Sequence, residues 1–320
     1  MLEREEHWIP AEGGIGLHAW VYRPDTAVTG SLQPAITLAH GFGGLTESGL
    51  IAYAERFAEA GFVVILHDHR GFGLSGGWPR QDIDPWRQIF DWRRVITYLQ
   101  DLPDVDPERI GIWGSSYAGG HALVLAGSDR RIKAVVSQIP TISGYKQGLR
   151  RNATPAARRE FQEWLADDER AQMRGSEPVR RELNNVDPDV PSAYTDPEMK
   201  AYEEYFNLPP LMRFDRKVTL RSTLKAQMYD PGIWIDRIAP TPLLMVVGTK
   251  DVITPPDLAF DAFERAGEPK KLITFDSGHF DAYVKEFETT GGGATSWFVE
   301  HLAAMPGNST APTHIEESRP

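Results

Sequence analysis

The stretch that decides the fold is RIGIWGSSYAGGHALVLA, residues 109–126. Its first five residues fit a short strand, and residues 117–126 have the composition of a helix. Between the two lies Ser116, with Gly114 two residues before it and Ala118 two residues after it. A serine on a sharp strand-to-helix turn needs small neighbours at both positions, because larger side chains would collide with the backbone. The stretch therefore predicts a nucleophile at Ser116, and a plain helix N-cap is the competing interpretation.

A second serine matches the literal Gly-x-Ser-x-Gly pattern better but fits the predicted fold less well. It is Ser75, in the run GLSGG at residues 73–77. The preceding apolar run, residues 62–66, ends well before it, and Trp78-Pro79 follows where a helix would have to begin. We therefore interpret this run as a glycine-rich loop.

Around the serine, predicted strands alternate with predicted helices. Short apolar runs bounded by polar residues indicate strands, and longer amphipathic segments indicate helices. The strands are expected at residues 14–22, 35–39, 62–66, 109–113, 132–136, 241–247 and 271–275. The helices are expected at residues 49–60, 85–99, 117–126, 256–266 and 281–302, the last interrupted or split by Gly291-Gly292-Gly293. This alternation is typical of a parallel α/β sheet with right-handed crossovers.

The alternation stops near Pro140 and resumes about a hundred residues later. The intervening chain is rich in Arg, Glu, Asp and Pro, and it contains helical patches but no clear buried strand. We interpret it as a mainly helical cap inserted into the core. The predicted organisation is a core, an inserted cap and a flexible tail, at residues 1–140 with 238–306, residues 141–237, and residues 307–320.

Four blocks of the chain resemble the α/β-hydrolase superfamily, in that family's order of nucleophile, acid and histidine. The blocks are His40-Gly41-Phe42-Gly43, residues 114–120, Gly248-Thr249-Lys250-Asp251 and Ser277-Gly278-His279-Phe280. The resemblance implies an α/β-hydrolase fold, with a mostly parallel sheet of about eight strands flanked by helices. More narrowly, residues 67–76, 119–121 and 278–283 are similar to capped dienelactone-hydrolase-like proteins and to the transferases and thiohydrolases of fungal polyketide pathways.

The resemblance implies a Ser-His-Asp triad. Ser116 would attack the substrate, and His279 would take its proton and pass it to the leaving group. Asp251, which follows a predicted strand, would orient His279 and stabilise its imidazolium form. Asp276 and Asp281 are nearer to His279 in sequence, but the carboxylate has to approach from a neighbouring strand end.

Backbone N–H groups are expected to form the oxyanion hole. The resemblance assigns one to Tyr117, directly after the nucleophile, and the other to Phe42, in the loop that follows residues 35–39. The helix that begins at Tyr117 would add its positive N-terminal end. His40 carries over as a structural histidine of the same loop.

Aromatic side chains are expected to line an apolar substrate pocket under the cap. The predicted substrate-binding residues are Trp78, Tyr145 and Tyr229, although plain packing competes as an interpretation for each. The wider set of cap aromatics comprises Tyr145, Phe161, Trp164, Tyr194, Tyr202, Tyr205, Phe206, Phe214, Tyr229 and Trp234. Such a pocket would suit an apolar or aromatic acyl or lactone substrate.

Charge and composition argue against several partners and cofactors. The formal net charge is −11, whereas a nucleic acid or an anionic membrane would require a basic face. The chain has no cysteine, no phosphate-binding or dinucleotide-binding glycine motif beside a strand, and no cluster with metal-ligand spacing, so neither metal nor cofactor is expected. No signal peptide or membrane span is recognisable, which makes a cytoplasmic protein the expectation. The sequence does not fix the oligomeric state, and a homodimer would be unsurprising.

Four functional hypotheses follow. The leading one is hydrolysis of a small-molecule ester, lactone or thioester through an acyl-enzyme at Ser116. Two alternatives use the same residues: transfer of the acyl group to an alcohol or amine, and cleavage of a proline-containing peptide. A non-enzymatic ligand receptor on this fold is disfavoured, because such a protein need not keep a nucleophile, a base and an acid together.

Overall fold

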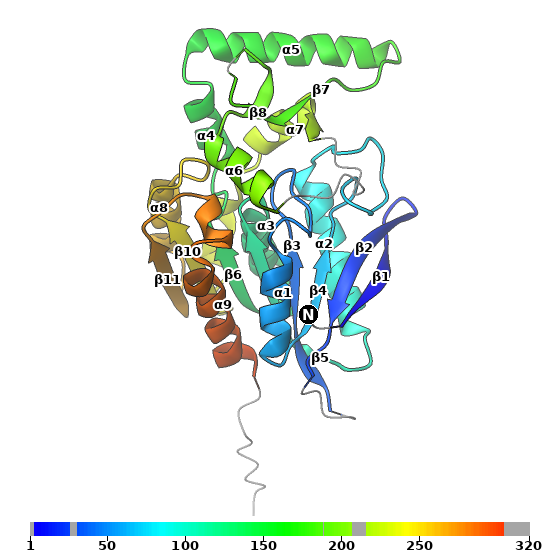
Figure 1. Ribbon diagram of the computed structural model, residues 1–320, viewed down its shortest axis with the longest axis vertical. Helices are drawn as coiled ribbons and strands as arrows, with labels where there is room; N and C mark the ends of the chain where they lie inside the picture. The colour runs from blue at the N-terminus through cyan, green and yellow to red at the C-terminus, as the bar shows by residue number, and fades with distance from the viewer. Residues whose placement is uncertain (1–2, 26–30, 188, 207–215, 304–320) are drawn as a thin grey trace, which may run out of the picture.

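The computed structural model describes residues 3–25, 31–187, 189–206 and 216–303. Its core strands are Arg4–Ala11 (β1), Ile15–Tyr22 (β2), Gln33–Ala39 (β3), Val63–His67 (β4), Val105–Ser115 (β5), Ile132–Gln138 (β6), Leu243–Gly248 (β10) and Lys270–Phe275 (β11). They form one sheet of eight strands in the order β1-β2-β4-β3-β5-β6-β10-β11 (Figure 1). The pairs β1–β2 and β2–β4 are antiparallel and the others are parallel, which confirms the prediction of a mostly parallel sheet.

Helices cover both faces of this sheet (Figure 1). One face packs against α1 (Ile51–Glu59) and α9 (Phe287–Leu302). The other packs against α2 (Pro85–Gln100), α3 (Tyr117–Ser128) and α8 (Pro256–Arg265).

Strand β4 illustrates why a strand covered on both faces is apolar. Its residues Val63 and Ile65 join the hydrophobic cluster on one face, whereas Val64 and Leu66 join the cluster on the other. Successive side chains of a strand point to opposite faces, so a strand covered on both sides needs a continuous apolar run. This run is the signal from which the buried strands could be predicted.

Residues 141–237 are called the insertion below; their described part lies on one side of the core, with α5 farthest from the sheet (Figure 1). Their elements are α4 (Gly144–Arg151), α5 (Pro155–Met173), β7 (Arg180–Asn184), β8 (Ser192–Tyr194), α6 (Pro197–Phe206), β9 (Lys217–Thr219), α7 (Leu220–Gln227) and the 3-10 helix η2 (Pro231–Arg237). The strands form a second sheet in the order β8-β7-β9, which the interpretation as a mainly helical cap did not include. Strands of three to five residues are too short to carry a readable periodicity.

The last helix differs from its prediction. Helix α9 continues through Gly291-Gly292-Gly293, and the chain breaks earlier, between α9 and the short 3-10 helix η3 (Phe280–Tyr283). Ala294, Trp297 and Phe298 of α9 are buried against the sheet, and this packing outweighs the low helix propensity of glycine.

Strand β1 was not predicted from the sequence. Ile9 is its only buried residue, and an exposed edge strand shows no clear apolar pattern.

The division into core and cap stays a prediction, and the predicted tail at residues 307–320 lies outside the described residues. Within the described ranges, no helix combines the length and apolar character that a membrane crossing requires.

Candidate active site

Ser116 occupies a strained turn between β5 and α3. Its backbone has φ 59° and ψ −119°, a combination rarely adopted by a residue with a side chain. Gly114 is obligatory at this turn, because a Cβ atom there would lie 2.1 Å from the carbonyl oxygen of Ala118. The turn therefore has the sharp geometry that presents a side chain at the end of a sheet.

The structure brings the three predicted triad residues together. His279 Nε2 lies 3.0 Å from Ser116 Oγ, and His279 Nδ1 lies 2.6 Å from Asp251 Oδ2. These residues follow the carboxyl ends of β5, β10 and β11, which lie at the same edge of the parallel sheet. His279 and Asp251 are almost completely buried, so their contact is shielded from water. The arrangement can carry a proton from the hydroxyl to the imidazole and can stabilise the cation that results.

Asp251 is held by a tight turn that sequence reasoning missed. Its Oδ1 accepts hydrogen bonds from the backbone N–H groups of Ile253 and Thr254, at 2.8 and 2.7 Å. The Thr254 hydroxyl lies 2.7 Å from Asp251 Oδ2 and 3.0 Å from the carbonyl oxygen of Ile139. The spacing Asp-x-x-Thr is a common local capping pattern and was a signal that could have identified Thr254.

The competing carboxylates lie away from the histidine. Asp276 is exposed and pairs with Lys250, whose Nζ lies 2.9 Å from its Oδ2. This pair, with a hydrogen bond from Thr249, lowers the pKa of Asp276. Asp281 lies 3.9 Å from Lys285 Nζ. Neither carboxylate has a hydrogen bond to His279 among the described residues.

The predicted oxyanion donors flank the nucleophile. Gly41 approaches Ser116 so closely that a Cβ atom there would lie 3.0 Å from Ser116 Cβ, and Phe42 is the next residue in the chain. Tyr117 is the first residue of α3, so its N–H has no acceptor within the helix. The rings of Phe42 and Tyr117 are also in contact, with centroids 5.4 Å apart. Both positions are compatible with the assignment of these N–H groups, which stays a prediction.

A cavity opens beside Ser116 and His279, and both the core and the insertion line it. We call it the Ser116 cavity. Its apolar wall includes Leu45, Leu50, Leu183, Met199 and Ile253. Of the wider set of predicted aromatics, Tyr194 and Tyr202 line it, whereas Phe214 lies outside the described residues.

Trp78, Tyr145 and Tyr229 are not among the residues that line the Ser116 cavity, which corrects the expectation that they line it. Trp78 is 73% exposed in a separate surface pocket beside Arg70. Tyr145 is 59% exposed. Tyr229 is fully buried and packs on Tyr117, with ring centroids 5.3 Å apart. Composition indicates which side chains are apolar, but the path of the insertion decides which of them reach the serine.

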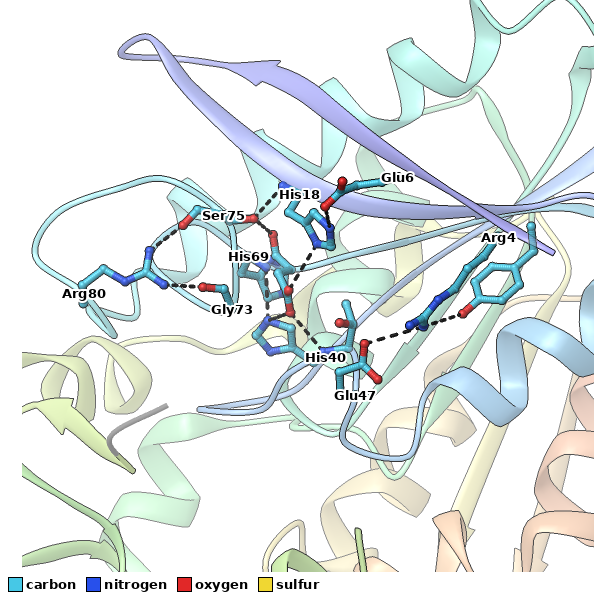
Figure 2. Close-up of polar contacts among 12 residues, drawn as sticks. Arg4, Glu6, His18, His40, Glu47, His69, Gly73, Ser75 and Arg80 are labelled. Carbon is cyan, nitrogen blue, oxygen red and sulfur yellow. Dashed lines mark hydrogen bonds and ion pairs between the residues drawn. The ribbon is translucent and has the colours of Figure 1, made fainter. Parts of the chain in front are cut away.

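Ser75, the literal motif match, has a structural role. Its hydroxyl donates to the carbonyl oxygen of Asp68 at 2.6 Å and accepts from the backbone N–H of His18 at 2.8 Å (Figure 2). It is completely buried, and it lies away from the Ser116 cavity. The interpretation of this run as a loop agrees with its geometry.

His40 supports the loop that carries Phe42. Its Nε2 accepts a hydrogen bond from the backbone N–H of His69 at 3.1 Å (Figure 2), so its proton must reside on Nδ1. Nδ1 then donates to the carbonyl oxygen of Gly41 at 2.9 Å. This neutral tautomer holds Gly41 against Ser116.

Four buried histidines form a cluster behind this loop. The ring of His69 lies within 5.7 Å of the rings of His40, His67 and His121. Burial, reinforced by the neighbouring His40, lowers the pKa of His67 and of His121 to about 3, and burial also lowers the pKa of His40 and His69. The cluster is therefore neutral in the folded protein.

We expect the free energy of unfolding to decrease as the pH falls below about 6.5, because the unfolded chain then binds protons that the buried rings exclude. The stabilisation is complete above that pH and is lost progressively towards the lowered pKa of the folded state. Each strongly shifted ring costs about 2 kcal/mol between about pH 7.5 and about pH 5. Urea denaturation of the wild type and of His67→Leu at both pH values measures this, and the variant should lose about 2 kcal/mol less. An equal loss in both proteins would contradict the assignment.

A buried hydrogen-bond network connects the serine turn to the histidine loop. Ser115 Oγ lies 2.6 Å from the hydroxyl of Tyr283 in η3. Gln138 donates to Ser115 Oγ at 3.3 Å and to the hydroxyl of Tyr53 at 3.1 Å, and its backbone oxygen accepts from Ser116 N–H at 2.9 Å. No local pattern in the sequence indicates this network, because its members lie on four separate elements.

No group of three or more His, Asp or Glu side chains in the described ranges is arranged to hold a metal ion.

Comparison with known proteins places the chain in a family. The model of the S15 family, X-Pro dipeptidyl-peptidase, matches residues 13–281. The quorum-quenching protein AidA of Acinetobacter baumannii is 33% identical over 273 residues, covering 84% of this chain and 85% of that protein. Thiohydrolase aneE of Aspergillus aculeatus is 30% identical over 247 residues, covering 76% and 77%.

A solved structure agrees over almost the whole chain. The α/β-hydrolase GrgF of Penicillium, which is named a polyketide transferase, superposes with a TM-score of 0.81 at 25% identity. The match covers 95% of this chain and all of that one. The chain therefore belongs to the S15 family and is a member of the α/β-hydrolase superfamily.

Proposed function

We propose that the chain hydrolyses esters, lactones or thioesters of small acyl molecules through an acyl-enzyme at Ser116. The observation that carries the proposal is the hydrogen-bonded chain Ser116–His279–Asp251, with contacts of 3.0 and 2.6 Å. A hydroxyl, an imidazole and a carboxylate in this order form the arrangement that activates serine as a nucleophile.

The first half of the reaction acylates Ser116. Its Oγ attacks the carbonyl carbon while His279 Nε2 takes the hydroxyl proton. The oxyanion that forms would accept hydrogen bonds from the N–H groups of Phe42 and Tyr117, and each such donor contributes roughly 3 kcal/mol. His279 then gives the proton to the leaving alcohol, thiol or lactone oxygen.

The second half releases the acid. Water gives a proton to His279 and its oxygen attacks the acyl carbon, after which the proton returns to Ser116 Oγ. Asp251 keeps the Nδ1 proton of His279 directed away from the serine in both halves and stabilises the imidazolium. The Ser116 cavity would hold the acyl chain, since its wall is largely apolar.

Acyl transfer is a second candidate, favoured by one comparison. The relative GrgF is named a polyketide transferase, and aneE is named a thiohydrolase. Both activities pass through the same acyl-enzyme and differ only in whether water or another nucleophile takes the acyl group.

A product assay separates the two candidates. We expect p-nitrophenyl and thioester substrates to yield the free acid at a rate that does not change when an alcohol or amine acceptor is added, because water reaches the acyl-enzyme. Chromatography of the products measures the ratio of acid to acyl-acceptor adduct, with enzyme-free reactions as the control. An adduct that accumulates in place of the acid would support the transferase instead.

A further inference from the structure

One acidic side chain lies in the apolar wall of the Ser116 cavity. It is Glu203, from helix α6 of the insertion, and it is the only carboxylate among the described residues that line the cavity. Met199, one turn earlier on the same helix, also lines the cavity. Tyr202, the preceding residue, contacts the ring of Phe280 beside the catalytic histidine, with centroids 4.8 Å apart. The helix thus seats Glu203 in the same space as Ser116.

The carboxylate of Glu203 has one charge partner among the described residues. The residue is 9% exposed, and neither carboxylate oxygen accepts a hydrogen bond from a described residue. The guanidinium of Arg216 forms an ion pair with it. Arg216 balances the negative charge and contacts Oε2, while Oε1 has no donor among the described residues.

An acceptor of this kind is costly beside apolar side chains. Buried carboxylate oxygens normally accept several hydrogen bonds, and leaving them without donors destabilises the protein. A substrate that brings a donor into the cavity would remove this cost and would bind more tightly than one that does not.

We propose that Glu203 is a specificity-determining residue that accepts a hydrogen bond from an uncharged donor, a hydroxyl or an amide N–H, on the acyl chain of the substrate. This inference rests on the proposed function of Ser116. The donor is uncharged because Arg216 already neutralises the carboxylate, and an ammonium group would have to compete with that guanidinium. The substrate class is therefore a hydroxyacyl or N-acylaminoacyl ester, lactone or thioester.

The test compares p-nitrophenyl esters of equal chain length. Plain hexanoate is the reference. The neutral donor esters carry a hydroxyl on the third or the terminal carbon, or an amide N–H within the chain as in N-acetyl-β-alanine. The charged comparison is 6-aminohexanoate, which carries an ammonium group. We expect at least one neutral donor ester to exceed hexanoate in kcat/KM by about tenfold, because a hydrogen bond to a charged group contributes that much. The gain should appear mainly in KM, since the bond lies away from the reacting carbon.

Variants of α6 show whether Glu203 is the acceptor. In Glu203→Leu the ratio of donor ester to hexanoate should fall to about one. In Glu204→Leu, the matched control on the exposed side of the same helix, the ratio should stay at the wild-type value. Glu203→Gln retains one acceptor oxygen without the charge and should give an intermediate ratio. Thermal melts of each variant test whether it folds. If Glu203→Leu does not fold, Glu203→Gln takes its place in the comparison of ratios.

The outcomes are distinguishable from those that test Ser116. Three results would overturn the inference and leave the proposed hydrolase function intact. In the first, no neutral donor ester has a higher kcat/KM than hexanoate; in the second, the preference for a donor ester survives Glu203→Leu. In the third, 6-aminohexanoate is the best substrate. Ester hydrolysis that is absent, or that persists in Ser116→Ala, would overturn the proposed function and this inference with it.

Discussion

Ser116→Ala is expected to lower kcat by about six orders of magnitude and to abolish labelling by a fluorophosphonate probe. The probe phosphonylates only an activated serine, and alanine removes the atom that forms the bond. The substitution removes one partly exposed hydroxyl and leaves the backbone turn in place, so the thermal midpoint should change little. In-gel fluorescence and the rate of p-nitrophenyl ester hydrolysis measure the two effects.

Ser75→Ala is the informative comparison, because Ser75 has the better match to the motif string. Its hydroxyl is buried between Asp68 and His18, so its loss should lower stability by about 1–3 kcal/mol while the folded fraction still binds the probe. Labelling that survives Ser116→Ala but disappears in Ser75→Ala would show that Ser75, in the loop of residues 73–77, is the nucleophile.

Asp251→Asn is expected to lower kcat by about four orders of magnitude with little change in KM. The asparagine amide can donate to His279 Nδ1, which would place the imidazole proton on Nε2, facing Ser116. In that tautomer the histidine cannot accept the serine proton. Thr254 and Ile253 should hold the amide in place, because their N–H groups can still bond to its oxygen. Steady-state kinetics and a melting curve measure the effect.

Asp276→Asn is the control for this substitution. Asp276 is also on a loop at the end of the sheet and is closer to His279 in sequence, but it is exposed and paired with Lys250. Surface pairs of this kind contribute little, so both kcat and stability should stay near wild type. A loss of activity in Asp276→Asn equal to that in Asp251→Asn would show that the acid had been assigned to the wrong strand.

The fold and the three residues at the strand ends were predictable for a local reason. A strand segment buried on both faces has to be apolar, so β4, β10 and residues 110–113 of β5 appear as short apolar runs. The carboxyl ends of parallel strands meet at one edge of a sheet, so residues that follow such runs must lie near one another. Ser116, Asp251 and His279 each follow a strand in this way, and their proximity could be inferred without coordinates.

The sequence contains no comparable local pattern for the residues that form the wall of the Ser116 cavity. Tyr202 and Glu203 line the cavity because α6 packs beside the loop of His279. Tyr145 is exposed, and Tyr229 is buried against Tyr117. The three strands of the insertion are too short to show a period, so the path of the chain between α5 and α7 was not readable.

The sequence by itself determined the class of fold, the position of the serine turn and the residues that follow the strand ends, because each depends on a pattern within a few residues. The tertiary structure alone decided the contact of Thr254 with Ile139, the contact between Ser115 and Tyr283, and the place of Glu203 in the cavity. Each of these joins segments far apart in the chain, or depends on which rotamer packing allows. Such contacts are set by the three-dimensional path of the backbone, which local pattern does not specify.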